Sequence, residues 1–174
     1  LPADGRDDPQ LDAVSNLPVS TLRCLQRLCE TGGVVAAHAA LAQLALAAGL
    51  YAAPVTGSKQ IGSVGAWTPE HQICCPLTAR GTECDHPLII ISFYRSYITA
   101  ADMKPITALF AALRAKGFAV MGLFAPSLKA PAAAAWLAAQ IRHFQPVCIV
   151  NVTSFSGKGA TGVSPLDAGN VPVF

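Results

Sequence analysis

Polar side chains gather where three apolar runs of the sequence end, "LIIISF", "FAVMGLF" and "VCIVNV". They comprise a phenol, two cations and several small polar groups: Tyr94, Arg95, Ser127, Lys129, Asn151 and Thr153, with Ser96 and Ser154 beside them. A guanidinium suits bidentate contact with a carboxylate or phosphate, and lysine adds a second positive charge. If the runs are parallel strands, their carboxyl ends share the edge where open α/β sheets bind ligands. We therefore expect a ligand-binding site built from the first six of these residues.

The same residues also fit a purely structural role. The backbone becomes exposed to solvent where a buried strand ends, so polar residues are common at strand ends. Arg95 can pair with Asp102 in its own loop, and Asn151 can cap a turn. The sequence leaves both interpretations open.

Strand and helix patterns alternate from residue 87 onward. "LIIISF" is too continuous for a half-exposed strand, so we expect it to be covered on both faces. "KPITALFAALRAKG" has apolar residues at helical spacing, with Pro105 at its start and Gly117 just past its end. A strand "FAVMGLF", a helix "APAAAAWLAAQIRHF" with Trp136 facing the sheet, a strand "VCIVNV" and the start of a fourth strand, "VPVF", follow. Short right-handed crossovers then predict an α/β fold with an open, mostly parallel sheet of the Rossmann or flavodoxin-like kind.

Three segments are expected along the chain. Residues 1–50 form a helical N-terminal segment, residues 51–86 a long irregular strap rich in Pro and Gly, and residues 87–174 a βαβαβ subdomain truncated at its C-terminal end. Trp67 is expected to fix the strap by packing. Since the first residue is Leu1 and the last residues resemble a strand that has just begun, we expect a piece of a longer polypeptide.

The composition is apolar for a domain that stands alone in water. Hydrophobic residues make up 52% and charged residues 13%, against roughly 25% charged in average proteins. Other protein is therefore expected to cover part of the surface.

The charge pattern indicates neither nucleic-acid binding nor a membrane span. The net charge of +2 is close to neutral, whereas nucleic-acid-binding domains are usually strongly basic. The uncharged stretch "VVAAHAALAQLALAAGL" contains His38 and Gln43 and lacks flanking aromatic or basic clusters, which favours a packed helix over a membrane span.

Six cysteines allow three disulfides, but their positions favour reduced thiols in the cytoplasm. Cys24 and Cys29 lie on a helical pattern and Cys148 lies in an apolar strand. "CCPLTARGTECDH" brings three cysteines near His86, a conceivable zinc set. It lacks the paired CxxC spacing of structural zinc sites, so no metal site is predicted.

Several familiar chemistries lack their sequence patterns. No G-x-G-x-x-G follows the first strand, and "GKGATG" departs from the phosphate-loop pattern G-x-x-x-x-G-K-[ST]. Neither a nucleophile elbow nor a carboxylate pair is present. No catalytic residue is therefore assigned.

The order of motifs from residue 88 to 174 resembles a known family. "FYR", the Pro105 helix, "SLK", "VCIVNVTSF", "SPLD" and "VPVF" are similar to the large subunit of aerobic cobaltochelatase, of the CobN type. This subunit is homologous to the H subunit of magnesium chelatase. "PADGRDDPQL" and "CETGG" resemble the preceding region of the family more loosely.

The resemblance implies the activity of a multi-subunit ligase that forms nitrogen–metal bonds. The large subunit binds the tetrapyrrole, while an AAA+ ATPase subunit and a second small subunit supply ATP hydrolysis. The implied reaction inserts Co2+ into hydrogenobyrinic acid a,c-diamide in cobalamin biosynthesis, in the cytoplasm. We expect neither Co2+ nor ATP to bind this chain itself, and we expect the chain alone to be inactive.

Two other functions stay open. The magnesium-chelatase branch would insert Mg2+ into protoporphyrin IX, although "FYR", "SLK" and the "PLD…PVF" ending favour cobalt. From a different class, the chain could be a non-catalytic α/β module that docks partner subunits or binds a ligand.

Overall fold

The computed structural model describes residues 9–57, 61–81, 86–153 and 162–174. The chain divides into two compact units. One contains Leu1–Ile61 and Thr99–Ala101, and the other contains Gly62–Ile98 and Asp102–Phe174. The division falls inside the segment predicted as a strap, so its two parts belong to different units.

The first unit is helical, with α1 (Pro9–Ala13), α2 (Val19–Thr31) and α3 (Gly33–Ala47). α2 buries Leu22 and Leu25 and packs along α3. Gly32 ends α2 with φ 68°, a conformation that glycine adopts without a steric cost, and α3 follows at once. Within the described part of the chain, no helix is both long enough and apolar enough to cross a membrane.

The second unit holds a five-stranded sheet. Its strands are β1 (Gly65–Thr68), β2 (Gln72–Cys74), β3 (Leu88–Tyr94), β4 (Ala119–Ala125) and β5 (Cys148–Asn151). They lie in the order β2-β1-β4-β3-β5. β4, β3 and β5 are parallel, as predicted, while β1 pairs antiparallel with both β2 and β4. The α/β fold class with an open, mostly parallel sheet is confirmed.

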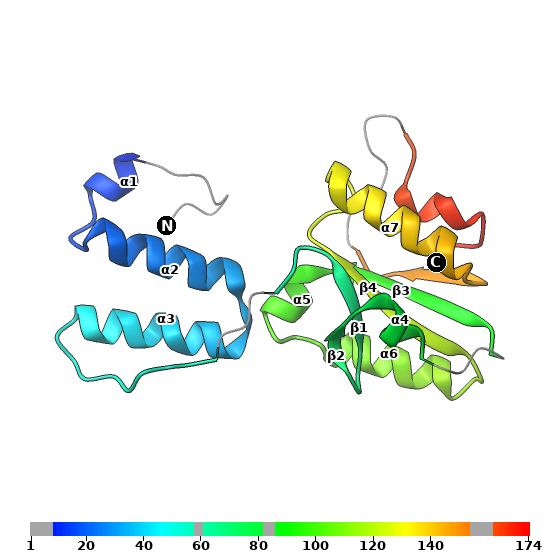
Figure 1. Cartoon of the computed structure of the whole chain (residues 1–174), viewed down its shortest axis with the longest axis horizontal. Coiled ribbons are helices and arrows are strands. Elements are labelled where there is room, and N and C mark those ends of the chain that lie inside the picture. The colour runs from blue at the N-terminus through cyan, green and yellow to red at the C-terminus, as the bar shows by residue number, and fades with distance from the viewer. Residues whose placement is uncertain (1–8, 58–60, 82–85, 154–161) are drawn as a thin grey trace. The chain divides into compact units, whose positions relative to one another are not determined.

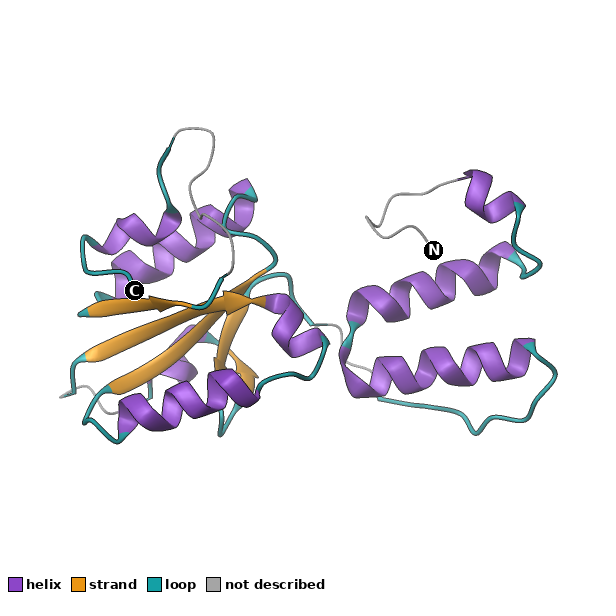
Figure 2. Ribbon diagram, turned by 180° about the vertical axis from the view of Figure 1, so that it is seen from behind, coloured by secondary structure: helices purple, strands orange, loops and turns teal. Residues whose placement is uncertain are grey.

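Helices cover both faces of this sheet. α6 (Lys104–Arg114) lies on one face, and α7 (Pro131–Phe144) lies on the other beside the short 3-10 helix η1 (Pro165–Gly169), as Figures 1 and 2 show. α4 (Pro76–Arg80) packs near β1 and β4, and α5 (Arg95–Thr99) follows β3 directly. Trp136 on α7 is half-buried against the core, in agreement with its predicted orientation toward the sheet.

Alternate residues of β3 and of β4 belong to two separate core layers. On the α7 face, Ile90 and Leu123 join Leu137 in a continuous buried cluster. On the α6 face, the indole of Trp67 packs edge-on against Phe110 and Phe93, with ring centroids 5.3 and 6.3 Å away. Trp67 is 2% exposed, so its predicted packing role is confirmed.

The last residues of the chain extend the parallel sheet beyond β5. Ile149 N–H donates to the Pro172 carbonyl (3.0 Å), and Asn151 N–H donates to the Phe174 carbonyl (2.7 Å). A parallel bridge joins Ile149 to Val173. This pairing begins a fourth parallel strand, as the sequence predicted.

The strap was expected to be irregular, but part of it adds to the sheet. β1, β2 and α4 all form between residues 65 and 80. Strands of four and three residues are too short to show a hydrophobic period. The pairing of β1 with β4 joins residues 55 to 59 positions apart in the sequence, and no local pattern indicates it.

Candidate functional site

The strand order creates a switch point between β3 and β5. β4 lies on one side of β3 and β5 lies on the other, so the crossover through α6 and the crossover through α7 run in opposite directions on opposite faces. In open α/β sheets, ligands bind in the crevice outside the carboxyl ends of the strands at such a reversal. The candidate site is therefore the carboxyl edge at the boundary between β3 and β5.

The predicted residues lie at this edge of the sheet. Tyr94, the last residue of β3, is level with Ala125 at the end of β4. Asn151, the last residue of β5, is level with Ser92 of β3. The structure thus brings the ends of the three parallel strands to one border, but ligand binding by these residues stays a prediction.

Arg95 has a contact that the sequence did not predict. Its Nε donates to the carbonyl of Gly62 at 3.0 Å, across 33 positions of sequence. Gly62 is the first residue of the α/β unit, so this bond ties the start of the unit to the end of β3. Arg95 therefore has a structural role in addition to any contact with a ligand.

Other predicted residues stabilise the turns that follow their strands. Ser127 Oγ accepts a hydrogen bond from Lys129 N–H at 3.1 Å. Asn151 Oδ1 accepts from the Thr153 hydroxyl at 2.9 Å and from Thr153 N–H at 3.4 Å. The turn-capping role considered for Asn151 is confirmed. Ser154 lies outside the described residues, as do Cys84 and most of "GKGATG".

Ser92 also lies at this border, although it was not among the residues predicted to form the site. Because Ser92 and Asn151 are paired in register, their side chains point to the same face of the sheet, the face that α7 covers. Ser92 is 1% exposed, and its hydroxyl has no hydrogen-bond partner among the described residues. An unpaired buried hydroxyl is costly, so it needs an explanation. The signal in the sequence is one serine inside an otherwise apolar run.

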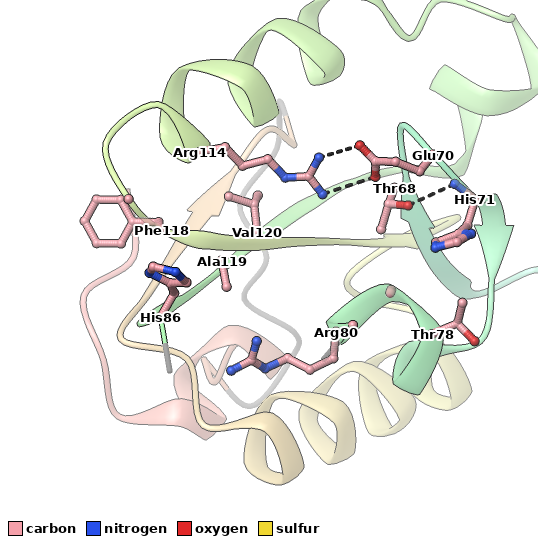
Figure 3. Close-up of a pocket in the computed structure, with 13 residues that line it drawn as sticks. Thr68, Glu70, His71, Thr78, Arg80, His86, Arg114, Phe118, Ala119 and Val120 are labelled. Atoms are coloured by element: carbon pink, nitrogen blue, oxygen red, sulfur yellow. Dashed lines mark hydrogen bonds and ion pairs between the residues drawn. The ribbon is translucent and has the colours of Figure 1, made fainter. Parts of the chain in front are cut away.

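A polar pocket of about 570 Å³ lies at the opposite edge, near the start of β4 (Figure 3). Arg114 bonds both carboxylate oxygens of Glu70, at 2.5 and 3.2 Å. This ion pair holds the pKa of Glu70 below its usual value. The guanidinium of Arg114 also lies 5.3 Å from the centre of the Phe110 ring. The pair joins positions 44 residues apart, so sequence spacing could not predict it.

The pocket does not assemble a metal centre from the residues that the structure describes. His71 and His86 both line it (Figure 3). Across residues 9–57, 61–81, 86–153 and 162–174, no three His, Cys, Asp or Glu side chains form a group that could hold a metal ion. The described cysteines, Cys24, Cys29, Cys74, Cys75 and Cys148, are free thiols.

Cys75 has a structural function at the start of α4. Its sulfur accepts a hydrogen bond from Thr78 N–H at 3.4 Å and lies 3.0 Å from the Thr78 hydroxyl. It therefore caps the helix. These bonds lower the pKa of the Cys75 thiol, whereas burial raises the pKa of Cys74 and of Cys148.

The CobN/magnesium chelatase family model matches residues 19–174 of the chain. The chain belongs to this family. The resemblance inferred from the motifs of residues 88–174 is therefore confirmed, and the match also includes α2, α3 and the strap.

One solved structure supports the fold of this CobN-family chain. It is the catalytic subunit of cobaltochelatase from Mycobacterium tuberculosis, with a TM-score of 0.60 and 18% sequence identity. The match covers 88% of the present chain and 12% of that subunit. No curated protein sequence matches the chain.

Proposed function

We propose that this chain is part of the tetrapyrrole-binding large subunit of an ATP-dependent cobaltochelatase. The reaction inserts Co2+ into hydrogenobyrinic acid a,c-diamide during cobalamin biosynthesis in the cytoplasm, forming nitrogen–metal bonds. The observation that carries the proposal is the family match over residues 19–174. An AAA+ ATPase subunit and a second small subunit supply ATP hydrolysis, so the chain alone has no activity.

Magnesium chelatase is the second candidate, because the matching family includes both branches. It would insert Mg2+ into protoporphyrin IX. The solved neighbour is named as a cobaltochelatase subunit, and this favours cobalt. A chelation assay of the complete protein with partner subunits and ATP, supplied with each metal and tetrapyrrole in turn, decides between the branches.

The carboxyl edge of the parallel sheet offers groups that suit the substrate of the cobalt branch. A corrin precursor carries several carboxylates around an apolar ring, and Arg95 and Lys129 are cations at the ends of β3 and β4. A hydrogen bond between a cation and a carboxylate contributes about 1.5–3 kcal/mol. Asn151 adds an amide at the end of β5. In this proposal, the edge binds and orients the periphery of the tetrapyrrole, and residues elsewhere perform metal insertion.

Tetrapyrrole binding tests this assignment of the edge. We would titrate the complete protein with hydrogenobyrinic acid a,c-diamide and follow the absorbance of the pigment. Arg95→Gln and Asn151→Ala are each expected to weaken binding about tenfold. Lys116→Gln, which removes an exposed cation after α6, is the control and should bind normally. Unchanged affinity in both edge variants would show that the edge is structural.

Subunit docking is the alternative from a different class. Gel filtration of the complete protein with the tetrapyrrole, and separately with the ATPase subunits, distinguishes the two roles. Deletion of residues 62–174 should remove pigment binding if the proposal holds. Loss of partner binding with pigment binding intact would favour docking.

A further inference from the structure

A second hollow lies between α7 and η1, beside the loop that follows β4. Its volume is about 430 Å³, within the range of about 300–1,000 Å³ typical of small-molecule sites. α7 and η1 pack side by side on the same face of the sheet (Figure 1). The hollow is separate from the polar pocket of Figure 3, which lies at the opposite edge of the sheet.

The wall that α7 provides is made of short apolar side chains. Ala134 and Ala138 are one helical turn apart, and Ala135 lies beside them. Across the hollow, η1 contributes Pro165 and Ala168. Methyl groups on both sides leave room for an apolar body and offer it no hydrogen bonds.

Two cations also line the hollow, from positions near opposite ends of α7. Lys129 precedes the helix, and Arg142 lies in its last turn. The helical part of the span, Pro131 to Arg142, rises by about 17 Å at 1.5 Å per residue, and Lys129 lies two residues before it. The long side chains of Lys129 and Arg142 shorten the span that a ligand must cover. Neither side chain has an ion pair or hydrogen bond with a residue that the structure describes.

The carboxylate in the lining is already engaged. Asp167 Oδ2 accepts a hydrogen bond from Ser164 N–H at 2.9 Å, and the Ser164 hydroxyl accepts from Leu166 N–H at 3.3 Å. These bonds form the capping box of η1. A positive charge in the last turn of a helix interacts favourably with the helix dipole. This accounts for a cation at residue 142, but it does not explain why Arg142 lines the same hollow as Lys129.

We propose that this groove binds an elongated ligand that has an apolar body and an acidic group at each end. The alanine wall takes the body, Lys129 binds one acidic group and Arg142 binds the other. The inference follows from the lining and does not rest on the chelatase assignment. Lys129 also belongs to the proposed tetrapyrrole edge, whereas Arg142 belongs to the groove alone, so Arg142→Gln separates the two proposals. Its test measures direct binding of a simple probe, so its failure would leave the proposed chelation reaction untouched.

Dodecanedioate, a linear dicarboxylate, is the probe, and isothermal titration of the complete protein measures its affinity. Two matched compounds separate the contributions of charge and apolar body. Dodecane-1,12-diol keeps the length without charge, and succinate keeps the two carboxylates without the long body. We expect saturable binding of dodecanedioate, at least tenfold weaker binding of the diol, and no saturable binding of succinate.

Variants locate the probe in the groove. Lys129→Gln and Arg142→Gln are each expected to weaken dodecanedioate binding about tenfold or more, because each removes one charge-assisted contact. Ala135→Leu fills part of the hollow from an exposed position and should also weaken it. Lys116→Gln lies outside the groove and should bind like the parent protein. Circular dichroism verifies that each variant is folded.

The proposal is overturned if dodecanedioate shows no saturable binding, or if the diol binds equally well. It is also overturned if either Lys129→Gln or Arg142→Gln leaves the affinity unchanged, since the arrangement requires both cations. Loss of affinity in both variants, with the control unaffected, supports it.

Discussion

Ser92 and Asn151 lie level with each other on neighbouring parallel strands, yet their polar groups do not pair. The amide oxygen of Asn151 accepts hydrogen bonds from Thr153 instead. The Ser92 hydroxyl is left buried without a partner in the described part of the structure. The border between β3 and β5 therefore contains a polar group that the fold itself does not need.

The first prediction concerns the stability of Ser92→Ala. Removing a buried hydroxyl that makes no hydrogen bond should leave the free energy of unfolding unchanged or raise it by up to about 1 kcal/mol. Ser164→Ala is the matched comparison, because the Ser164 hydroxyl caps η1. This variant should lower the free energy of unfolding by about 0.5–2 kcal/mol. Urea unfolding of the 174-residue chain measures both values. If Ser92→Ala destabilised the chain as much as Ser164→Ala, the hydroxyl would have a bonding partner in solution.

The second prediction concerns Gly122, in the middle of β4. A Cβ atom there would lie 2.9 Å from the Trp67 carbonyl oxygen and 2.9 Å from Cε1 of Phe93. The carbonyl belongs to a paired strand and has little freedom to move. Gly122→Ala should therefore lower the free energy of unfolding by about 1–3 kcal/mol.

Thermal unfolding followed by tryptophan fluorescence tests Gly122→Ala, because Trp67 lies in the affected layer. Ser63→Ala, an exposed change just before β1, should stay within about 0.5 kcal/mol of the parent. Equal stability of Gly122→Ala and the parent would mean that β1 lies farther from β4 than the structure shows.

The third prediction concerns the ion pair between Glu70 and Arg114. Both side chains are well exposed, at 52% and 39%, so a double-mutant cycle with Glu70→Gln and Arg114→Gln should give a coupling below about 1 kcal/mol. High salt should reduce it further.

The pH dependence of this coupling follows from the lowered pKa of Glu70. A group with a lower pKa in the folded state contributes stability above its unfolded pKa and loses it as pH falls through the folded value. The coupling should thus be present at neutral pH and disappear well below the ordinary value of 4.5. A coupling that persisted in strong acid would show that the pair is not ionic.

The fourth prediction concerns the order in which cysteines react. Since the thiolate is the reactive form, the lowered pKa of Cys75 should make it react with iodoacetamide before Cys74 and Cys148, whose pKa values are raised by burial. Mass spectrometry of brief labelling reactions gives the order. Thr78→Val removes the hydroxyl that contacts the Cys75 sulfur, so it should slow the reaction of Cys75 with iodoacetamide several-fold. In the denatured chain, Cys74 and Cys75 should react at similar rates. Faster labelling of Cys74 in the folded chain would contradict the prediction.

Elements with long periodic patterns were the most predictable from the sequence. The apolar run that forms β3 and the helical spacing that forms α6 depend only on local burial, so both elements were predictable. The alternation of strand and helix with short connections then predicted parallel pairing and a shared carboxyl edge. The predicted residues lie at that edge. The turn-capping bond of Asn151 joins neighbours in the sequence and could be anticipated, whereas the bond from Arg95 to Gly62 joins residues 33 positions apart that no pattern specifies.

The amino-acid order by itself determined the class of fold and the strand ends where polar residues emerge, because both follow from local spacing. Its motifs also carried the resemblance to the family that the family model then confirmed. Only the tertiary structure decided that β5 pairs with β3 rather than β4, that β1 completes the sheet, and that Arg142 shares a groove with Lys129. These relationships join residues that are distant in the chain. Side-chain packing selects them from many arrangements that the same hydrophobic pattern allows.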